Sequence, residues 1–255
     1  MLWNSFQMNW SDVGIVLSSK KYGESSVIVS LMTLEHGRHS GLVRGGSGKR
    51  ARGIYQAGNL VSVDWSARIE DQLGSFRCEL LKPLAALYLD DVLRLAGLSS
   101  ACAVVERALP ERENNLDVYE SLFNFLTNLE SEEWLENYVR WEISLLAALG
   151  FGLNLSSCAS TGQSVDLIYV SPKSGQAVSA IAGKPYKDKL LELPSFLTQG
   201  LESSTLINYS AIYQGLYLTS YFLDRNAFIH NKNGAPSARD RLVDRVKQKH
   251  IIVKR

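Results

Sequence analysis

Over residues 10–82, apolar and polar positions alternate with a period of two, as expected for strands that bury one face. The alternation is regular over 59–65, and 26–33 is rich in β-branched residues. Five segments are predicted to be strands: 13–17, 26–33, 38–44, 59–65 and 73–81. Glycine-marked turns between them predict a small closed or partly open barrel. The periodicity fits an OB-fold and an SH3-like barrel equally well.

Beyond Pro83 the apolar spacing changes to the i, i+3, i+4, i+7 pattern of helices. Helices are predicted over 84–95, 99–109, 116–129, 134–149 and 212–226, with a helix start at Pro194 and a last helix after Pro236. Gly150 ends one of them, and 151–193 is irregular apart from a strand at 167–170 and a turn at 171–175. The chain therefore reads as a multi-domain α+β protein.

We place its parts at four ranges: a barrel over 1–83, a helical domain over 84–150 and 194–255, and a small insertion over 151–193.

Charge is unevenly distributed along the chain, although the net charge is only +1. Residues 1–83 carry +3, residues 84–150 carry −8 and residues 151–255 carry +6. Such asymmetry indicates which partners each part of the chain can bind, because a basic surface attracts polyanions and an acidic one repels them. The two ends are suited to nucleic acid, and the acidic middle to scaffolding or protein contact.

A glycine-rich stretch between His36 and Val63 contains five cations and no acidic residue. Backbone donors and cations in such a loop can follow a phosphate backbone, although a solvated β-hairpin is the plain alternative. The predicted last helix carries five more cations, three of them arginines. A solvated helix face with Asp240 and Asp244 as acidic partners is the plain alternative, but the excess of cations favours nucleic acid. The candidate DNA-binding residues are Arg38, Arg44, Lys49, Arg50, Arg52, Arg239, Arg241 and Arg245.

Aromatic residues of the barrel could stack on bases, but in a small barrel each is more often part of the core. These residues are Trp10, Tyr22, Tyr55 and Trp65.

The sequence lacks the P-loop, the H-E-x-x-H and the G-x-S-x-G patterns, so it offers no complete catalytic constellation. A structural zinc needs four ligands, typically from two C-x-x-C pairs. Only Cys158 could serve, since Thr161, Ser179 and Ala182 occupy the other three places. We expect no metal and an ordinary buried thiol at Cys158.

Three widely spaced cysteines argue against a disulfide framework and for a reducing compartment, the cytoplasm. No basic segment followed by an apolar one opens the chain, and no apolar stretch approaches the ~20 residues of a membrane span. We therefore expect neither a signal peptide nor a membrane segment.

Several short motifs occur in one order along the chain, at residues 8–17, 22–26, 35–46, 56–60, 149–153, 158–162, 169–175 and 235–239. Together they resemble the RecO family of bacterial recombination mediators, most of all its alphaproteobacterial branch. The resemblance implies an N-terminal five-stranded OB-fold barrel, an α-helical domain and a small zinc-ribbon-like insertion. Many family members carry two C-x-x-C pairs there, so with only Cys158 this insertion is expected to lack zinc.

The resemblance further implies a non-enzymatic, cytoplasmic and nucleoid-associated protein without cofactor. Such a protein binds single- and double-stranded DNA, anneals complementary strands and contacts single-stranded-DNA-binding protein. With RecR it helps to load RecA. The residues leave a second reading open, a protein–protein adaptor that reaches DNA only through its partners. A metal-dependent nuclease is a weaker third reading, since no acidic cluster lies near the basic loop.

Overall fold

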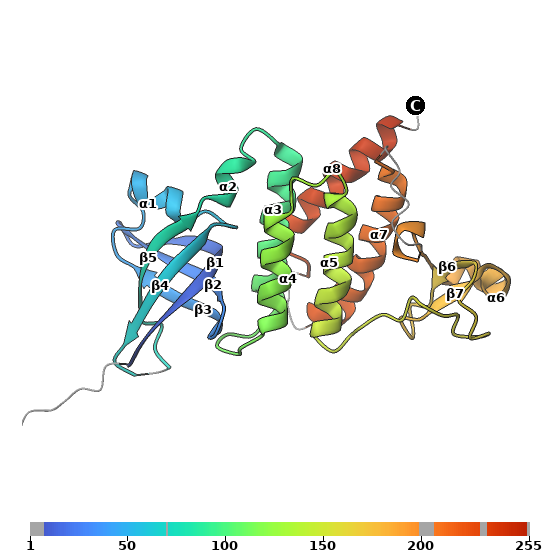
Figure 1. Ribbon diagram of the computed structural model, residues 1–255, viewed down its shortest axis with the longest axis horizontal. Helices are drawn as coiled ribbons and strands as arrows, with labels where there is room; N and C mark the ends of the chain where they lie inside the picture. The colour runs from blue at the N-terminus through green and yellow to red at the C-terminus, as the bar shows by residue number, and fades with distance from the viewer. Residues whose placement is uncertain (1–7, 70, 199–206, 230–233, 254–255) are drawn as a thin grey trace, which may run out of the picture. The chain divides into compact units, whose positions relative to one another are not determined.

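The alternating segments of the first part of the chain fold into a closed five-stranded barrel (Figure 1). The computed structural model describes residues 8–69, 71–198, 207–229 and 234–253. Its strands are β1 (Met8–Tyr22), β2 (Ser26–Thr33), β3 (Gly37–Val43), β4 (Leu60–Ala67) and β5 (Ser75–Lys82). The order around the barrel is β1-β2-β3-β5-β4, with β1 pairing antiparallel to β4 and β3 parallel to β5. The predicted five-stranded barrel is confirmed, in the OB-fold form.

Alternate side chains of these strands fill the barrel. Val29, Leu31 and Val61 are fully buried, and Trp65 and Phe76 close the same core. Gly41 allows β3 to approach β5, because a Cβ at Gly41 would lie 2.5 Å from the Phe76 ring. The barrel is therefore a packed core, and its outer face is left for binding.

A short helix, α1 (Lys49–Ile54), interrupts the stretch that we expected to be a loop. No residue of α1 is buried, so it shows no apolar period by which a helix can be found in a sequence. Lysine, arginine and alanine are good helix formers, which explains why a helical turn follows the extended N-cap residue Gly48.

Three helices complete the first of two compact units, Met1–Thr127. They are α2 (Leu84–Leu87), α3 (Val92–Ala108) and α4 (Leu116–Thr127). The boundaries predicted for the helices over 84–95 and 99–109 are wrong: the break falls at Asp91, and α3 then runs uninterrupted. Asp91 caps α3, since its Oδ1 accepts hydrogen bonds from the backbone N–H groups of Leu93 and Arg94 at 3.1 and 2.9 Å.

The connection between α3 and α4 is attached to strand β3 of the barrel by hydrogen bonds. The Arg112 N–H donates to the carbonyl of Arg38 at 2.7 Å, and Ser40 Oγ donates to Glu111 at 2.5 Å. Gly37, with φ +65°, lies so close that a Cβ would overlap the Glu113 carbonyl.

The second unit, Asn128–Arg255, is built on three helices. They are α5 (Trp134–Ala148), α7 (Tyr209–Phe222), which continues as a π-helical turn η3 (Leu223–Ala227), and α8 (Ser237–Val253). Helix α5 ends just before Gly150, as predicted, and α8 begins after Pro236, as predicted. The helix start predicted at Pro194 gives only a 3₁₀ turn, η2 (Ser195–Leu197), and residues 199–206 lie outside the described ones.

In the sequence between α5 and α7, the chain forms a small three-stranded sheet in the order β7-β6-β8. It comprises β6 (Leu167–Val170), β7 (Ala177–Ser179) and β8 (Leu191–Glu192), with α6 (Ala180–Gly183) and a 3₁₀ turn, η1 (Lys184–Lys189), after β7. The strand predicted at 167–170 is confirmed. The other two have three and two residues, too few to show alternation in a sequence.

Candidate nucleic-acid interface

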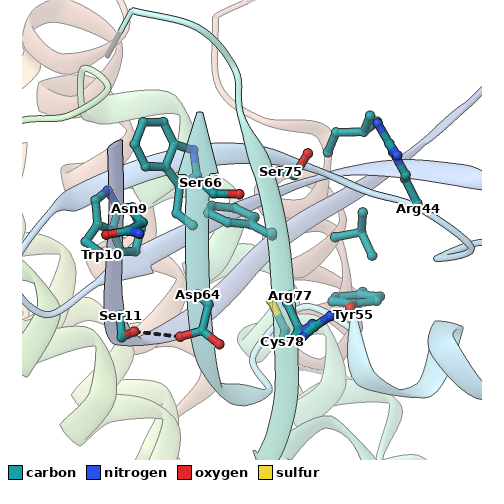
Figure 2. Close-up of a pocket in the computed structure, with 14 residues that line it drawn as sticks. Asn9, Trp10, Ser11, Arg44, Tyr55, Asp64, Ser66, Ser75, Arg77 and Cys78 are labelled. Atoms are coloured by element: carbon teal, nitrogen blue, oxygen red, sulfur yellow. Dashed lines mark hydrogen bonds between the residues drawn. The ribbon is translucent and has the colours of Figure 1, made fainter. Parts of the chain in front are cut away.

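A groove of about 830 Å³ opens on the outer face of the barrel, across β1, β4 and β5 (Figure 2). Its floor is polar because the outward positions of the three strands carry polar side chains in register. Ser11 lies opposite Asp64, which lies opposite Arg77, and Ser11 Oγ donates a 2.6 Å hydrogen bond to Asp64. A second row crosses the same strands at Asn9, Ser66 and Ser75.

We did not predict these groove residues as functional. The regular alternation over 59–65 and 73–81 was the available signal, since it fixes which side chains face outward. Alternation alone, however, cannot separate a binding face from an ordinary solvated one.

The basic segment, residues 44–55, borders this groove at its two ends, and we call it the basic rim. Arg44 is exposed at the end of β3 and lines the groove, and Tyr55, directly after α1, lines it too. Between them lie Lys49, Arg50 and Arg52, all exposed. Four of the predicted cations are thus gathered on one stretch of backbone beside the groove.

Arg38 has a different role. Its Nε donates to the carbonyl of Leu109 at 2.8 Å and its Nη1 to Glu111 at 3.1 Å, and only 17% of the side chain is exposed. The guanidinium ties β3 to the connection between α3 and α4, so we remove Arg38 from the phosphate-contacting set.

The prediction for Arg239 is wrong, because the side chain is 2% exposed and cannot reach a phosphate. Its Nε and Nη2 donate to the two carboxylate oxygens of Glu142 at 2.6 and 2.9 Å. Arg241 and Arg245 of the same helix are exposed and stay predictions.

Aromatic rings serve mainly as core, as expected. Trp65 and Tyr55 are 2% and 7% exposed. Trp10 is stacked between the rings of His36 and Trp65, with centroid distances of 4.1 and 5.6 Å. Tyr22, the exception, is exposed at the end of β1 that does not line the groove.

Ionisable groups under the groove stay neutral near pH 7. Burial raises the pKa of Cys78 to about 12, and burial together with the neighbouring Cys78 thiol raises the pKa of Tyr55 to about 12. Burial, assisted by Arg112, lowers the pKa of His39 to about 4. The groove therefore presents hydrogen-bond donors, Arg44 and Arg77, and one carboxylate, Asp64.

Cys158 is buried, as predicted, in the insertion. Its Sγ accepts a hydrogen bond from the Ser179 N–H at 3.3 Å and lies 3.5 Å from Ser179 Oγ. Burial opposes ionisation, but hydrogen bonds from Thr161, Ser179 and the Ser160 backbone outweigh it and lower the pKa of Cys158 to about 6. Thr161 and Ser179, which stand where zinc-binding relatives would carry further ligands, thus hydrogen-bond to the Cys158 sulfur. Within the described ranges, no group of three or more His, Cys, Asp or Glu could hold a metal.

Two family models match the chain in succession. The description "Recombination protein O N terminal" matches residues 8–84, and "Recombination protein O C terminal" matches residues 89–234. The chain belongs to the RecO family. The N-terminal RecO match coincides with the barrel that carries the groove, whereas α8 lies beyond the C-terminal RecO match.

Curated relatives agree over nearly the whole chain. The DNA repair protein RecO of Rhodospirillum rubrum is 49% identical over 247 residues, covering 94% of this chain and 97% of the relative. That of Rhodospirillum centenum is 46% identical over 245 residues (95% and 96%), and that of Mesorhizobium japonicum 40% over 248 residues (97% and 97%). The RecO family is one of DNA repair proteins. Among the described residues, no helix has both the length and the apolar content needed to cross a bilayer.

Proposed function

We propose that this RecO-family chain is a non-enzymatic recombination mediator that binds single- and double-stranded DNA and anneals complementary strands. In this proposal it acts with RecR to load RecA onto DNA coated by single-stranded-DNA-binding protein. The supporting observation is the basic rim, where Arg44, Lys49, Arg50 and Arg52 are exposed beside a polar groove.

The rim suits a phosphate backbone for an electrostatic reason. Lysine and arginine displace the counterions condensed on DNA, and this release drives binding without reading the base sequence. Two strands bound in this way repel each other less, which favours annealing. The polar floor of the groove, with Asp64 and Arg77, can hydrogen-bond base edges of an unpaired strand.

The test is fluorescence anisotropy with a labelled single-stranded oligonucleotide across a salt series without divalent metal. The variant Arg50→Ala/Arg52→Ala should bind more weakly for every sequence, and its salt slope should fall by roughly 1.4 units, at ~0.7 per lost contact with a single strand. The matched control Lys20→Ala/Lys21→Ala removes two cations nine residues or more beyond Ser11 along β1. An Arg50/Arg52 variant that binds like the control refutes the assignment of the rim.

The adaptor reading has one observation in its favour. Large apolar side chains are 39–60% exposed between the end of β5 and the start of α3, namely Leu80, Leu81, Leu87, Leu89 and Val92. Exposed apolar residues in a row are a feature of protein contacts. If the isolated chain fails to bind DNA even at low salt, the adaptor reading replaces ours.

A further inference from the structure

The 3₁₀ turn η1 in the insertion presents three lysines and a tyrosine to solvent. All six of its residues are exposed, and the Tyr186 side chain is 61% exposed. Just before it, Ile181 of α6 is 85% exposed. The three lysines, Lys184, Lys187 and Lys189, make no ion pair with any residue that the structure describes.

The geometry of a 3₁₀ turn sorts these side chains onto separate faces. With three residues per turn, side chains at i and i+3 eclipse one another. Lys184 and Lys187 therefore share one face, and Tyr186 shares the next with Lys189. The one acidic residue, Asp188, stands on the third face behind Pro185. By this spacing, Tyr186 lies on a face with Lys189 and next to the face of Lys184 and Lys187, and Asp188 lies on the remaining face.

The turn is held in place by the sheet. Gly183, which immediately precedes it, packs so tightly that a Cβ would lie 2.5 Å from the Tyr169 ring on β6 and 3.1 Å from Leu190. At the other end the Leu190 N–H donates to the Lys187 carbonyl, and the Leu193 N–H donates to Ile168 at 2.9 Å. Figure 1 shows α6 following directly on this sheet. A partner would meet a preformed surface with little ordering cost.

We propose that η1 is a second nucleic-acid site, specific for single strands and located in the second unit. An exposed ring flanked by cations is the arrangement that binds unpaired bases, because the ring stacks on a base while lysines contact adjacent phosphates. A duplex has its bases stacked inside and offers Tyr186 no face. A solvated turn explains the lysines, but it gives no reason for an exposed ring between them.

Two separate polyanion sites give one chain the means to hold two strands at once. Linked sites convert the second binding event into an intramolecular one, at a raised effective concentration. This consequence rests on the proposed function, since it requires that the barrel groove binds DNA as well. Annealing then depends on both sites, whereas capture of one strand needs only one of them.

The test uses the full chain in two assays. Lys184→Gln/Lys187→Gln/Lys189→Gln should lower the salt slope for a single-stranded oligonucleotide by about two units, at ~0.7 per contact. It should also slow annealing of complementary strands at least tenfold. Tyr186→Ala should weaken binding of single strands roughly 5- to 150-fold, as expected for the loss of one base stack, and leave duplex binding unchanged. The control Tyr186→Phe keeps the ring and should bind like the wild type.

Photocrosslinking gives a readout that does not depend on affinity. A bromodeoxyuridine oligonucleotide should crosslink to the peptide that contains Tyr186. If the triple variant keeps the wild-type slope and annealing rate and the Tyr186 peptide stays uncrosslinked, while Arg50→Ala/Arg52→Ala weakens binding, the second site alone is overturned. The turn then belongs to a protein partner or to solvent. A wild-type chain that binds no DNA at all overturns the proposed function together with this inference.

Discussion

Replacing Arg239 by alanine should destabilise the second unit rather than remove a DNA contact. The guanidinium lies in the core of α5, α7 and α8, where it pairs with Glu142, whose side chain has no exposed surface. Removing the cation leaves the Glu142 carboxylate buried in an apolar interior without its counter-charge. The Arg241→Ala variant of the same helix changes an exposed side chain and serves as the matched control.

The magnitude follows from the contacts that are lost. Besides both oxygens of Glu142, the guanidinium donates to Ser220 Oγ at 2.6 Å and to the Leu216 carbonyl at 3.1 Å. Among the residues that the structure describes, Glu142 then keeps Tyr138 and Thr219 as donors. Breaking a buried pair by deleting one partner costs about 3–5 kcal/mol. With a denaturant slope of about 2 kcal/mol/M, the urea midpoint of this unit should fall by about 2 M.

The assay must report on one unit at a time, because a signal from the whole chain averages two compact units. Hydrogen exchange of the α5, α7 and α8 amides across a urea series meets this need. Arg241→Ala should lie within about 0.5 kcal/mol of wild type. The double variant Arg239→Met/Glu142→Leu should recover most of the loss, because no unpaired charge is left.

One result refutes this reasoning. If Arg239→Ala keeps wild-type exchange protection and yet weakens DNA binding at least as much as Arg241→Ala, the Arg239 side chain reaches a phosphate and its burial does not describe the working protein.

Three further predictions concern pH and backbone space. The pKa of His39 is about 4 in the folded chain and 6.5 unfolded, so the unfolded state binds more protons in between. The first unit should lose stability as pH falls from 6.5 to 4, and His39→Leu should flatten this dependence in urea titrations at several pH values; an equal slope in both proteins contradicts it. The pKa of Cys158 falls from 9.0 to about 6 on folding, so its contribution is complete above pH 9 and is lost as pH falls to 6. Cys158→Ser should abolish that trend in the second unit, and a wild-type pH profile in the variant would argue against the ionised thiol. Gly37→Ala should lower the stability of the first unit by more than Gly45→Ala, since both have positive φ but only Gly37 is crowded, by the Glu113 carbonyl; equal thermal shifts would show that crowding is immaterial.

Sequence patterns predicted the barrel well because each strand buries one face, which forces a period of two. Helix α1 was not predicted because it is short and none of its residues is fully buried, although Ala51 and Ile54 pack against the barrel core. The break at Asp91 was not predicted because the apolar spacing continues across it. The sequence does contain one indication that a cation such as Arg239 is buried in an ion pair. Glu142 stands on the otherwise apolar face of α5, and a buried carboxylate requires a buried cation. Which cation supplies it depends on tertiary packing, because Arg239 is 97 residues away.

The groove could be predicted only in part. Register places Ser11, Asp64 and Arg77 in one row, and register can be inferred from alternation once the strand order is known. The gathering of Arg44 and α1 at its rim depends on the path between β3 and β4. That path is not periodic, so nothing in the spacing of apolar residues reports it.

The bonds between β3 and the connection after α3 bear on how this protein can be dissected. Residues 109–113 accept hydrogen bonds from Arg38 and Ser40 and pack closely against Gly37. A fragment ending at residue 83 would therefore expose an arginine and a serine that have lost these acceptors. Such a fragment would retain every strand and still be a poor mimic of the barrel in its native setting. The smallest piece on which DNA binding by the barrel groove can be fairly assayed ends after α4, near Thr127.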